Sequence, residues 1–155
     1  MNLTGWIAPV CDRSEEDVRY AASILGMSWN EMSSSQRTEY MSGLKGCMNR
    51  VDFERIENNI GILLNEINLD FVEEELPDFL TEEYFKGLRG RVVTLREEYP
   101  IHEDTPRVPD LPFNTWQKFN AIEKILLDIH EVATAQFKHY AGNEIYAGDT
   151  VGLLL

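Results

Sequence analysis

Hydrophobic residues recur at helical spacing along five separate stretches of the chain. The clearest stretch runs from Val51 to about Leu69, where apolar side chains follow one another at steps of three and four residues. This spacing places them on one face, which is the pattern of a helix packed lengthwise against another helix. The apolar positions of this face are Phe53, Ile56, Ile60, Leu63 and Ile67.

Sequence signals for helix ends divide the rest of the pattern into four more helices. Ser14 followed by Asp17, and Ser33 followed by Gln36, predict two capping boxes, in which side chain and backbone cap each other reciprocally. Gly26 is expected to end the first helix. We therefore predict helices over about 14–26, 33–46, 51–69, 81–99 and 116–140.

Three other segments lack the helical pattern. Pro9 favours an extended backbone at Ala8, so residues 6–10 predict an extended N-terminal lead. Residues 99–112 contain four prolines and predict a stiff linker. Residues 141–155 are rich in Gly, Tyr and Val, which predicts turns and one or two short strands.

These patterns together predict a mainly α fold. We expect a bundle of about five helices with an extended N-terminal lead and a short β-like C-terminal tail. The predicted helical domain covers residues 1–140, with the proline-rich linker 99–112 inside it, and the tail covers residues 141–155.

Two short motifs recur within the chain. The motif Phe-x-x-Ile-Glu occurs at 53–57 and again at 119–123, within helices that have equally spaced apolar faces. Such helices can pack together as matched halves of a bundle, although any two amphipathic helices share this spacing. Tyr-Ala-Gly followed by Asn or Asp occurs at 140–143 and 146–149. This second repeat predicts turns in a segment that docks on its own bundle or on a partner.

The charge balance narrows the classes of partner. The chain has 27 acidic and 14 basic residues, a net charge of −13. We therefore expect no binding to nucleic acid, which needs a basic surface, and no docking on an anionic membrane. Cys11 and Cys47 are too few for a disulfide framework, and we expect both thiols to be reduced. The N-terminus lacks the pattern of a signal peptide, and no apolar run approaches the length of about 20 residues that spans a bilayer.

No known catalytic or metal-binding pattern stands out. His130 and His139 lie nine residues apart on one predicted helix, near opposite faces, so they cannot form the usual metal-binding pair. Runs of glutamate predict solvated helix faces. We expect no enzymatic activity, no cofactor and no metal site. Asn58 and Asn59 are unusual in mid-helix, and either a neighbouring backbone or solvent could satisfy them.

Several sequence pieces, in a fixed order, carry a resemblance to a known group of proteins. They are Trp-Ile-Ala-Pro-Val-Cys-Asp-Arg at 6–13, Gly-Leu-Lys-Gly at 43–46, Asp-x-x-Arg-Ile-Glu-x-Asn-Ile at 52–60 and Asn-x-Ile-Glu-x-Ile-Leu at 120–126. The chain resembles small minor structural, or tail, proteins encoded in phages and prophages of Firmicutes. Those proteins close on a Tyr-x-Gly-Glu-like repeat, which here carries Asn143 and Asp149 where Glu is commoner.

The resemblance implies a non-catalytic component of the virion, from the tail or baseplate region, made in the host bacterial cytoplasm. Its expected partners are other phage structural proteins and further copies of itself. Two alternatives remain open at this point: an acidic mimic of DNA that inhibits a host nuclease or defence protein, and a carbohydrate-binding tail module. Aromatic and apolar residues in the non-helical ends are the expected assembly contacts: Trp6, Tyr140, Tyr146, Val151 and Leu153.

Overall fold

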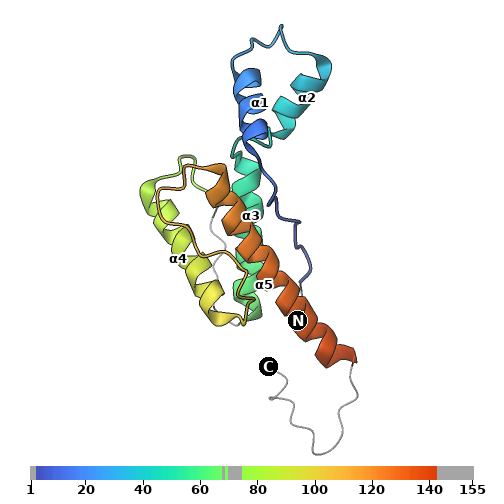
Figure 1. Ribbon diagram of the computed structural model, residues 1–155, viewed down its shortest axis with the longest axis vertical. Coiled ribbons are helices and arrows are strands. Elements are labelled where there is room, and N and C mark those ends of the chain that lie inside the picture. The colour runs from blue at the N-terminus through green and yellow to red at the C-terminus, as the bar shows by residue number, and fades with distance from the viewer. Residues whose placement is uncertain (1–2, 68, 70–74, 143–155) are drawn as a thin grey trace, which may run out of the picture.

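The computed structural model describes residues 3–67, 69 and 75–142, the last seven of them by their backbone alone. Within these ranges the protein is helical and contains no strand, which confirms the mainly α prediction (Figure 1). The strands predicted in the tail fall almost wholly outside the described residues. The helices are α1 (Glu15–Leu25), α2 (Ser34–Ser42), α3 (Arg50–Glu66), α4 (Glu82–Glu98) and α5 (Trp116–Gly142).

Local capping explains where the helices begin. The predicted capping box at Ser14 is present: the Asp17 amide donates to Ser14 Oγ, and the Ser14 amide donates to the Asp17 carboxylate. Ser33 caps α2 in the same way, and Thr81 caps α4 through its hydroxyl oxygen. Each cap satisfies backbone groups that a helix terminus leaves unpaired, so each start is encoded within a few residues.

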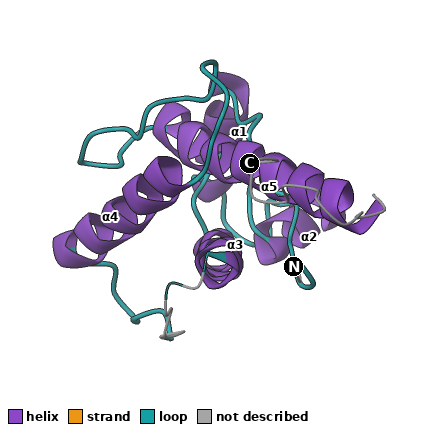
Figure 2. Cartoon of the chain, turned by 90° about the horizontal axis from the view of Figure 1, so that it is seen from below, coloured by secondary structure: helices purple, strands orange, loops and turns teal. Residues whose placement is uncertain are grey.

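Helices α3, α4 and α5 pack against one another around the main core (Figure 2). The predicted apolar faces of α3 and α5 both point into this core, where Ile56, Ile60, Ile122 and Leu126 are fully buried. α3 ends at Glu66, about one turn before the predicted end, and α5 runs two residues past its predicted end. The bundle therefore rests on the lengthwise packing that the spacing predicts.

The proline-rich linker contains no helix, as predicted, and crosses the outside of the bundle. Side chains of α4 and α5 donate to its backbone carbonyls: Arg96 Nε to Pro106 at 2.9 Å, Arg89 Nε to Pro109 at 3.0 Å, and Lys118 Nζ to Pro112 at 2.8 Å. Thr105 is buried and donates to Asp128. These contacts satisfy carbonyls that no regular structure pairs.

The first two helices form a hairpin that projects from one end of the bundle (Figure 1). It has a small core of its own, made by Ala21, Ile24, Met32 and Leu44, separate from the main core. α2 buries none of its side chains. The α1–α2 hairpin is therefore a small, separately packed unit, and its outer face is exposed to solvent.

Candidate functional site

The predicted N-terminal lead, residues 6–10, is part of a longer non-helical segment, residues 3–13, which we call the lead from here on. It lies along α3 and α5 and is held mainly through its backbone (Figure 1). Asn59 on α3 binds both backbone groups of Ile7: its Oδ1 accepts from the amide at 3.1 Å, and its Nδ2 donates to the carbonyl at 2.7 Å. Asn120 on α5 does the same for Arg13, at 3.2 and 2.9 Å. Two asparagine clamps thus hold the lead at points six residues apart.

Glu123 on α5 is the centre of a buried charged cluster, with a relative exposure of 1%. Its Oε1 accepts from Arg55 Nη2 at 2.6 Å and from Arg13 Nη2 at 3.0 Å. Its Oε2 accepts from Arg55 Nε at 3.0 Å and from the Val10 amide at 2.6 Å. One carboxylate therefore joins α5 to α3 and to the lead.

Asp52 completes this cluster, which we call the clasp: Arg13, Asp52, Arg55 and Glu123. Asp52 Oδ1 accepts from Arg13 at 3.2 Å and from Arg55 at 2.9 Å. Burial by itself would lower the pKa of the Arg55 guanidinium, but the hydrogen bonds and charges of Glu123 and Asp52 raise it overall. Two guanidinium groups face two carboxylates, so the clasp is internally neutral.

The glutamate at the matching position of the first repeat has a similar role. Glu57 on α3 accepts from Tyr84 Oη at 2.8 Å and from Arg91 Nη2, both on α4. Burial and the charge of Glu57 together raise the pKa of Tyr84 well above its ordinary value. Both glutamates of the repeated Phe-x-x-Ile-Glu motif thus accept hydrogen bonds from an arginine on another helix.

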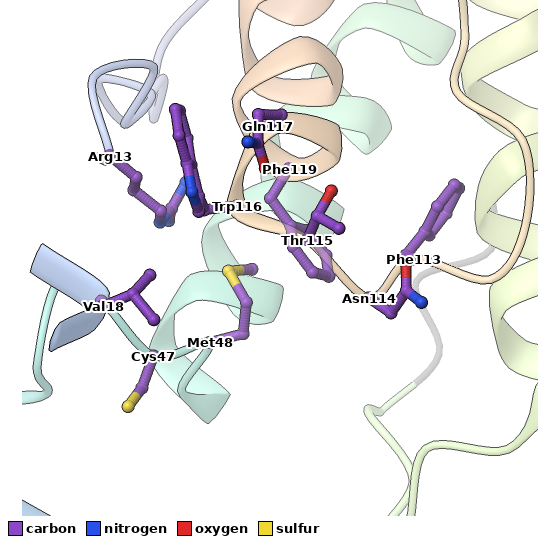
Figure 3. Close-up of a pocket in the computed structure, with 11 residues that line it drawn as sticks. Arg13, Val18, Cys47, Met48, Phe113, Asn114, Thr115, Trp116, Gln117 and Phe119 are labelled. Atoms are coloured by element: carbon purple, nitrogen blue, oxygen red, sulfur yellow. The ribbon is translucent and has the colours of Figure 1, made fainter. Parts of the chain in front are cut away.

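A cavity of about 430 Å³ lies where the α1–α2 hairpin meets the start of α5. Figure 3 shows Arg13 and Trp116 along one wall and Val18, Cys47 and Met48 across from them. Arg13 also belongs to the clasp, and two carboxylates already balance its charge. The other lining residues include no Asp, Glu, Lys, Arg or His. The cavity therefore offers apolar contact together with hydrogen bonds from uncharged side chains such as Asn114, Thr115 and Gln117.

Only one predicted assembly residue can be placed by its side chain. Trp6 is half-buried, packs against the main core and stacks on His130 of α5, with ring centroids 4.1 Å apart. That Trp6 also contacts a neighbouring subunit stays a prediction. The side chain of Tyr140 lies outside the described residues, as do Tyr146, Val151 and Leu153 altogether.

The thiols, histidines and acidic residues form no metal-like cluster within the described part of the chain. Burial, together with the charge of Glu123, raises the pKa of the Cys11 thiol to about 11. The thiol is therefore protonated at neutral pH, and thiolate chemistry is suppressed. His130 is partly buried under Trp6, and burial lowers its pKa.

One feature of the sequence could have pointed to the clasp and to the asparagine clamps: polar residues at positions on the apolar faces of the helices. Glu123 comes four residues after Phe119 and three before Leu126, so it occupies the apolar face of α5. Asn59 likewise lies on the apolar face of α3, four residues before Leu63. A polar residue on a buried face predicts a specific partner. The partner itself is distant in sequence and is revealed only by the fold.

No helix in the described ranges combines the length and apolar character needed to cross a membrane. The chain was compared with protein-family models, with curated proteins and with solved structures, and none of the three comparisons gave a match.

Proposed function

We propose that this protein is a structural component of a phage or prophage particle, in its tail or baseplate region, and that it acts through protein–protein contacts without catalysis. Its partners are other phage structural proteins and further copies of itself. The proposal starts from the resemblance carried by the sequence pieces at 6–13, 43–46, 52–60 and 120–126.

The observation that supports the proposal is where these pieces meet. Arg13 comes from the first piece, Arg55 from the third and Glu123 from the fourth, and the three side chains hydrogen-bond within the clasp. The second piece also has a packing role, because a Cβ on Gly46 would lie 2.1 Å from the Asp17 carbonyl oxygen. All four pieces of the resemblance therefore serve one architecture.

The hydrogen bonds of the clasp indicate a structural role, which is to hold the lead in place. Both oxygens of Glu123 already accept two hydrogen bonds each from groups of the same chain. The clasp fixes the lead to two helices, and a charge-paired contact of this kind specifies a unique arrangement. A fixed lead gives every copy the same surface, and a symmetric assembly uses the same surface of each copy.

Mass spectrometry of purified particles tests the proposal. Particles induced from the host strain would be banded by density, and the chain quantified against a major tail protein. We expect a constant ratio across the particle peak and loss of the chain from a neighbouring empty fraction of the same gradient. A chain absent from the particles, or one that binds a basic host protein in a strongly salt-sensitive way, would favour the DNA-mimic alternative.

A further inference from the structure

The large apolar side chains that the fold leaves exposed gather on the α1–α2 hairpin. Nine such side chains are exposed in the described ranges, and five of them lie between residues 15 and 42. A concentration of this kind on one element is typical of an interaction surface. The five are Tyr20, Leu25, Trp29, Tyr40 and Met41.

Several of these residues form one connected surface. The rings of Trp29 and Tyr40 meet edge to face with centroids 6.3 Å apart, and the Arg37 guanidinium carbon lies 5.3 Å from the centre of the Trp29 ring. Met41, exposed at 74%, follows in α2. We call these four residues the hairpin face. Trp, Tyr and Arg are the residues most enriched where protein contacts are strongest.

Arg37 gives the hairpin face a charge preference. It donates to the Trp29 carbonyl, but no carboxylate in the described part of the chain forms an ion pair with it. The other basic residues of this region are already paired, Arg19 with Glu15 and Lys45 with Asp12. The hairpin face thus suits an apolar segment that carries a carboxylate.

Residues 143–155 have this composition. They include two acidic residues, Glu144 and Asp149, and neither Lys nor Arg. They also include one tyrosine, Tyr146, and several aliphatic residues, among them Val151 and Leu153. The segment is therefore complementary to the hairpin face in both charge and apolar character.

The position of this segment argues against a contact within one molecule. It follows the C-terminal end of α5, whereas the hairpin lies beyond the opposite end of the bundle (Figure 1). α5 has 27 residues and is about 40 Å long. Thirteen residues span at most about 45 Å when fully extended. The segment would have to run straight back along all of α5 merely to approach its own hairpin.

We propose that residues 143–155 of one copy bind the hairpin face of a second copy, so that copies join head to tail. The inference rests on the proposed assembly function, because it takes one of the proposed partners, a further copy of this chain, and names the surface that this copy binds. A head-to-tail contact leaves one hairpin face and one segment unfilled at the two ends, so it propagates into a ring or a filament.

Charge reversal in the full-length chain tests this contact. Arg37→Glu places a carboxylate opposite an acidic segment, and the double change Glu144→Lys, Asp149→Lys places cations opposite Arg37. We expect each variant alone to self-associate at least tenfold more weakly than the unchanged chain, by sedimentation velocity at about 0.15 M salt, where long-range repulsion between acidic chains is screened. An equimolar mixture restores both contacts, so we expect association within about threefold of the unchanged chain.

A matched control is Arg107→Glu, which reverses an exposed charge of the linker. It should associate like the unchanged chain, and circular dichroism should show equal helicity for all variants. An unchanged chain that stays monomeric up to millimolar concentration would overturn the proposal, as would a mixture that fails to restore association. Particle mass spectrometry is independent of this result: a chain found in particles but monomeric in solution would keep the proposed function and refute the head-to-tail contact.

Discussion

Glu123 shows how one residue fixes the arrangement of distant segments. It is buried on the apolar face of α5, and its four hydrogen bonds reach the lead and α3. A buried charge is unfavourable unless it is fully paired, and here the pairing requires Arg13 and Arg55 to be in place. The lead and the two helices are therefore coupled through one side chain.

Removing the charge of Glu123 should weaken the whole fold. Glu123→Gln leaves Arg13 and Arg55 with Asp52 as their only carboxylate, and breaking a buried ion pair costs about 3 kcal/mol or more. We expect the free energy of unfolding, measured by urea titration, to fall by that amount. The control is Glu54→Gln, which removes an exposed ion pair with Arg50 and should cost less than about 0.5 kcal/mol. Equal losses in the two variants would show that the clasp adds no more stability than a surface pair.

His130 should make stability depend on pH. Burial lowers its pKa below the ordinary value of 6.5, and the charge of Glu131 offsets this only in part. The unfolded chain binds this proton more tightly, so the contribution of His130 is complete above about pH 6.5 and is lost as the pH falls through the lower folded-state pKa.

The corresponding measurement is the free energy of unfolding at pH 7.5 and pH 5.0. We expect a larger decrease for the unchanged chain than for His130→Gln, which removes the titrating group. Other groups titrate alike in both proteins and cancel in the comparison. An equal decrease would mean that the stacking of Trp6 on His130 does not disfavour the charged imidazole.

At the scale of elements, the hairpin and the bundle depend on different packing. α3, α4 and α5 share the main core, whereas α1 and α2 share a four-residue core of their own. α2 has nine residues and buries none of them. Because a helix this short is marginal without tertiary contacts, the hairpin should open more readily than the bundle.

Gly46 and Gly90 differ in the space around them: at Gly46 the backbone packs closely against α1, whereas at Gly90 there is room for a side chain. A Cβ at Gly46 would lie 2.1 Å from the backbone of α1 at Asp17, whereas one at Gly90 in α4 would meet nothing within 4 Å. We expect Gly46→Ala to destabilise the hairpin by about 2 kcal/mol, seen as faster hydrogen exchange of α1 amides. Gly90→Ala should instead stabilise the protein by up to about 1 kcal/mol. The hypothesis of a close approach at Gly46 fails if Gly46→Ala leaves α1 exchange unchanged.

At the scale of the whole molecule, the described core and the proposed tail contacts come from different parts of the chain. Among the residues whose side chains are described, the main core ends at Ala133, and the predicted tail contacts come after residue 139. The exposed hairpin face lies at the other end of the bundle (Figure 1). We therefore expect that changes in the tail can alter the proposed assembly without altering the fold.

Deleting the chain from Ala141 onward should separate these two properties. The main core stays complete, so we expect a helical protein whose melting temperature lies within about 3 °C of the full chain. We also expect the truncated chain to be missing from purified particles when both forms are expressed together. Normal incorporation of the truncated chain would remove the assembly role of residues 141–155.

The sequence by itself determined the helices. Apolar spacing and capping residues act within one or two turns, so the pattern predicted the five helices of the described ranges, the linker at 99–112 and the capping boxes at Ser14 and Ser33. It also marked Asn59 as an unusual mid-helix residue with a backbone or solvent as its partner. These features depend on residues that are close together in the chain, so the sequence pattern alone predicts them.

Only the tertiary structure decided what those residues contact. The Val10 amide and Glu123 are 113 residues apart, and Arg55 and Glu123 are 68 apart, so no local pattern links them. The stacking of Trp6 on His130 and the hydrogen bond from the Ile7 amide to Asn59 likewise join residues far apart in the sequence. Helix positions follow from short-range periodicity, whereas the clasp and the course of the lead depend on how the packed helices bring distant polar groups together, because a buried polar group is stable only beside its partner.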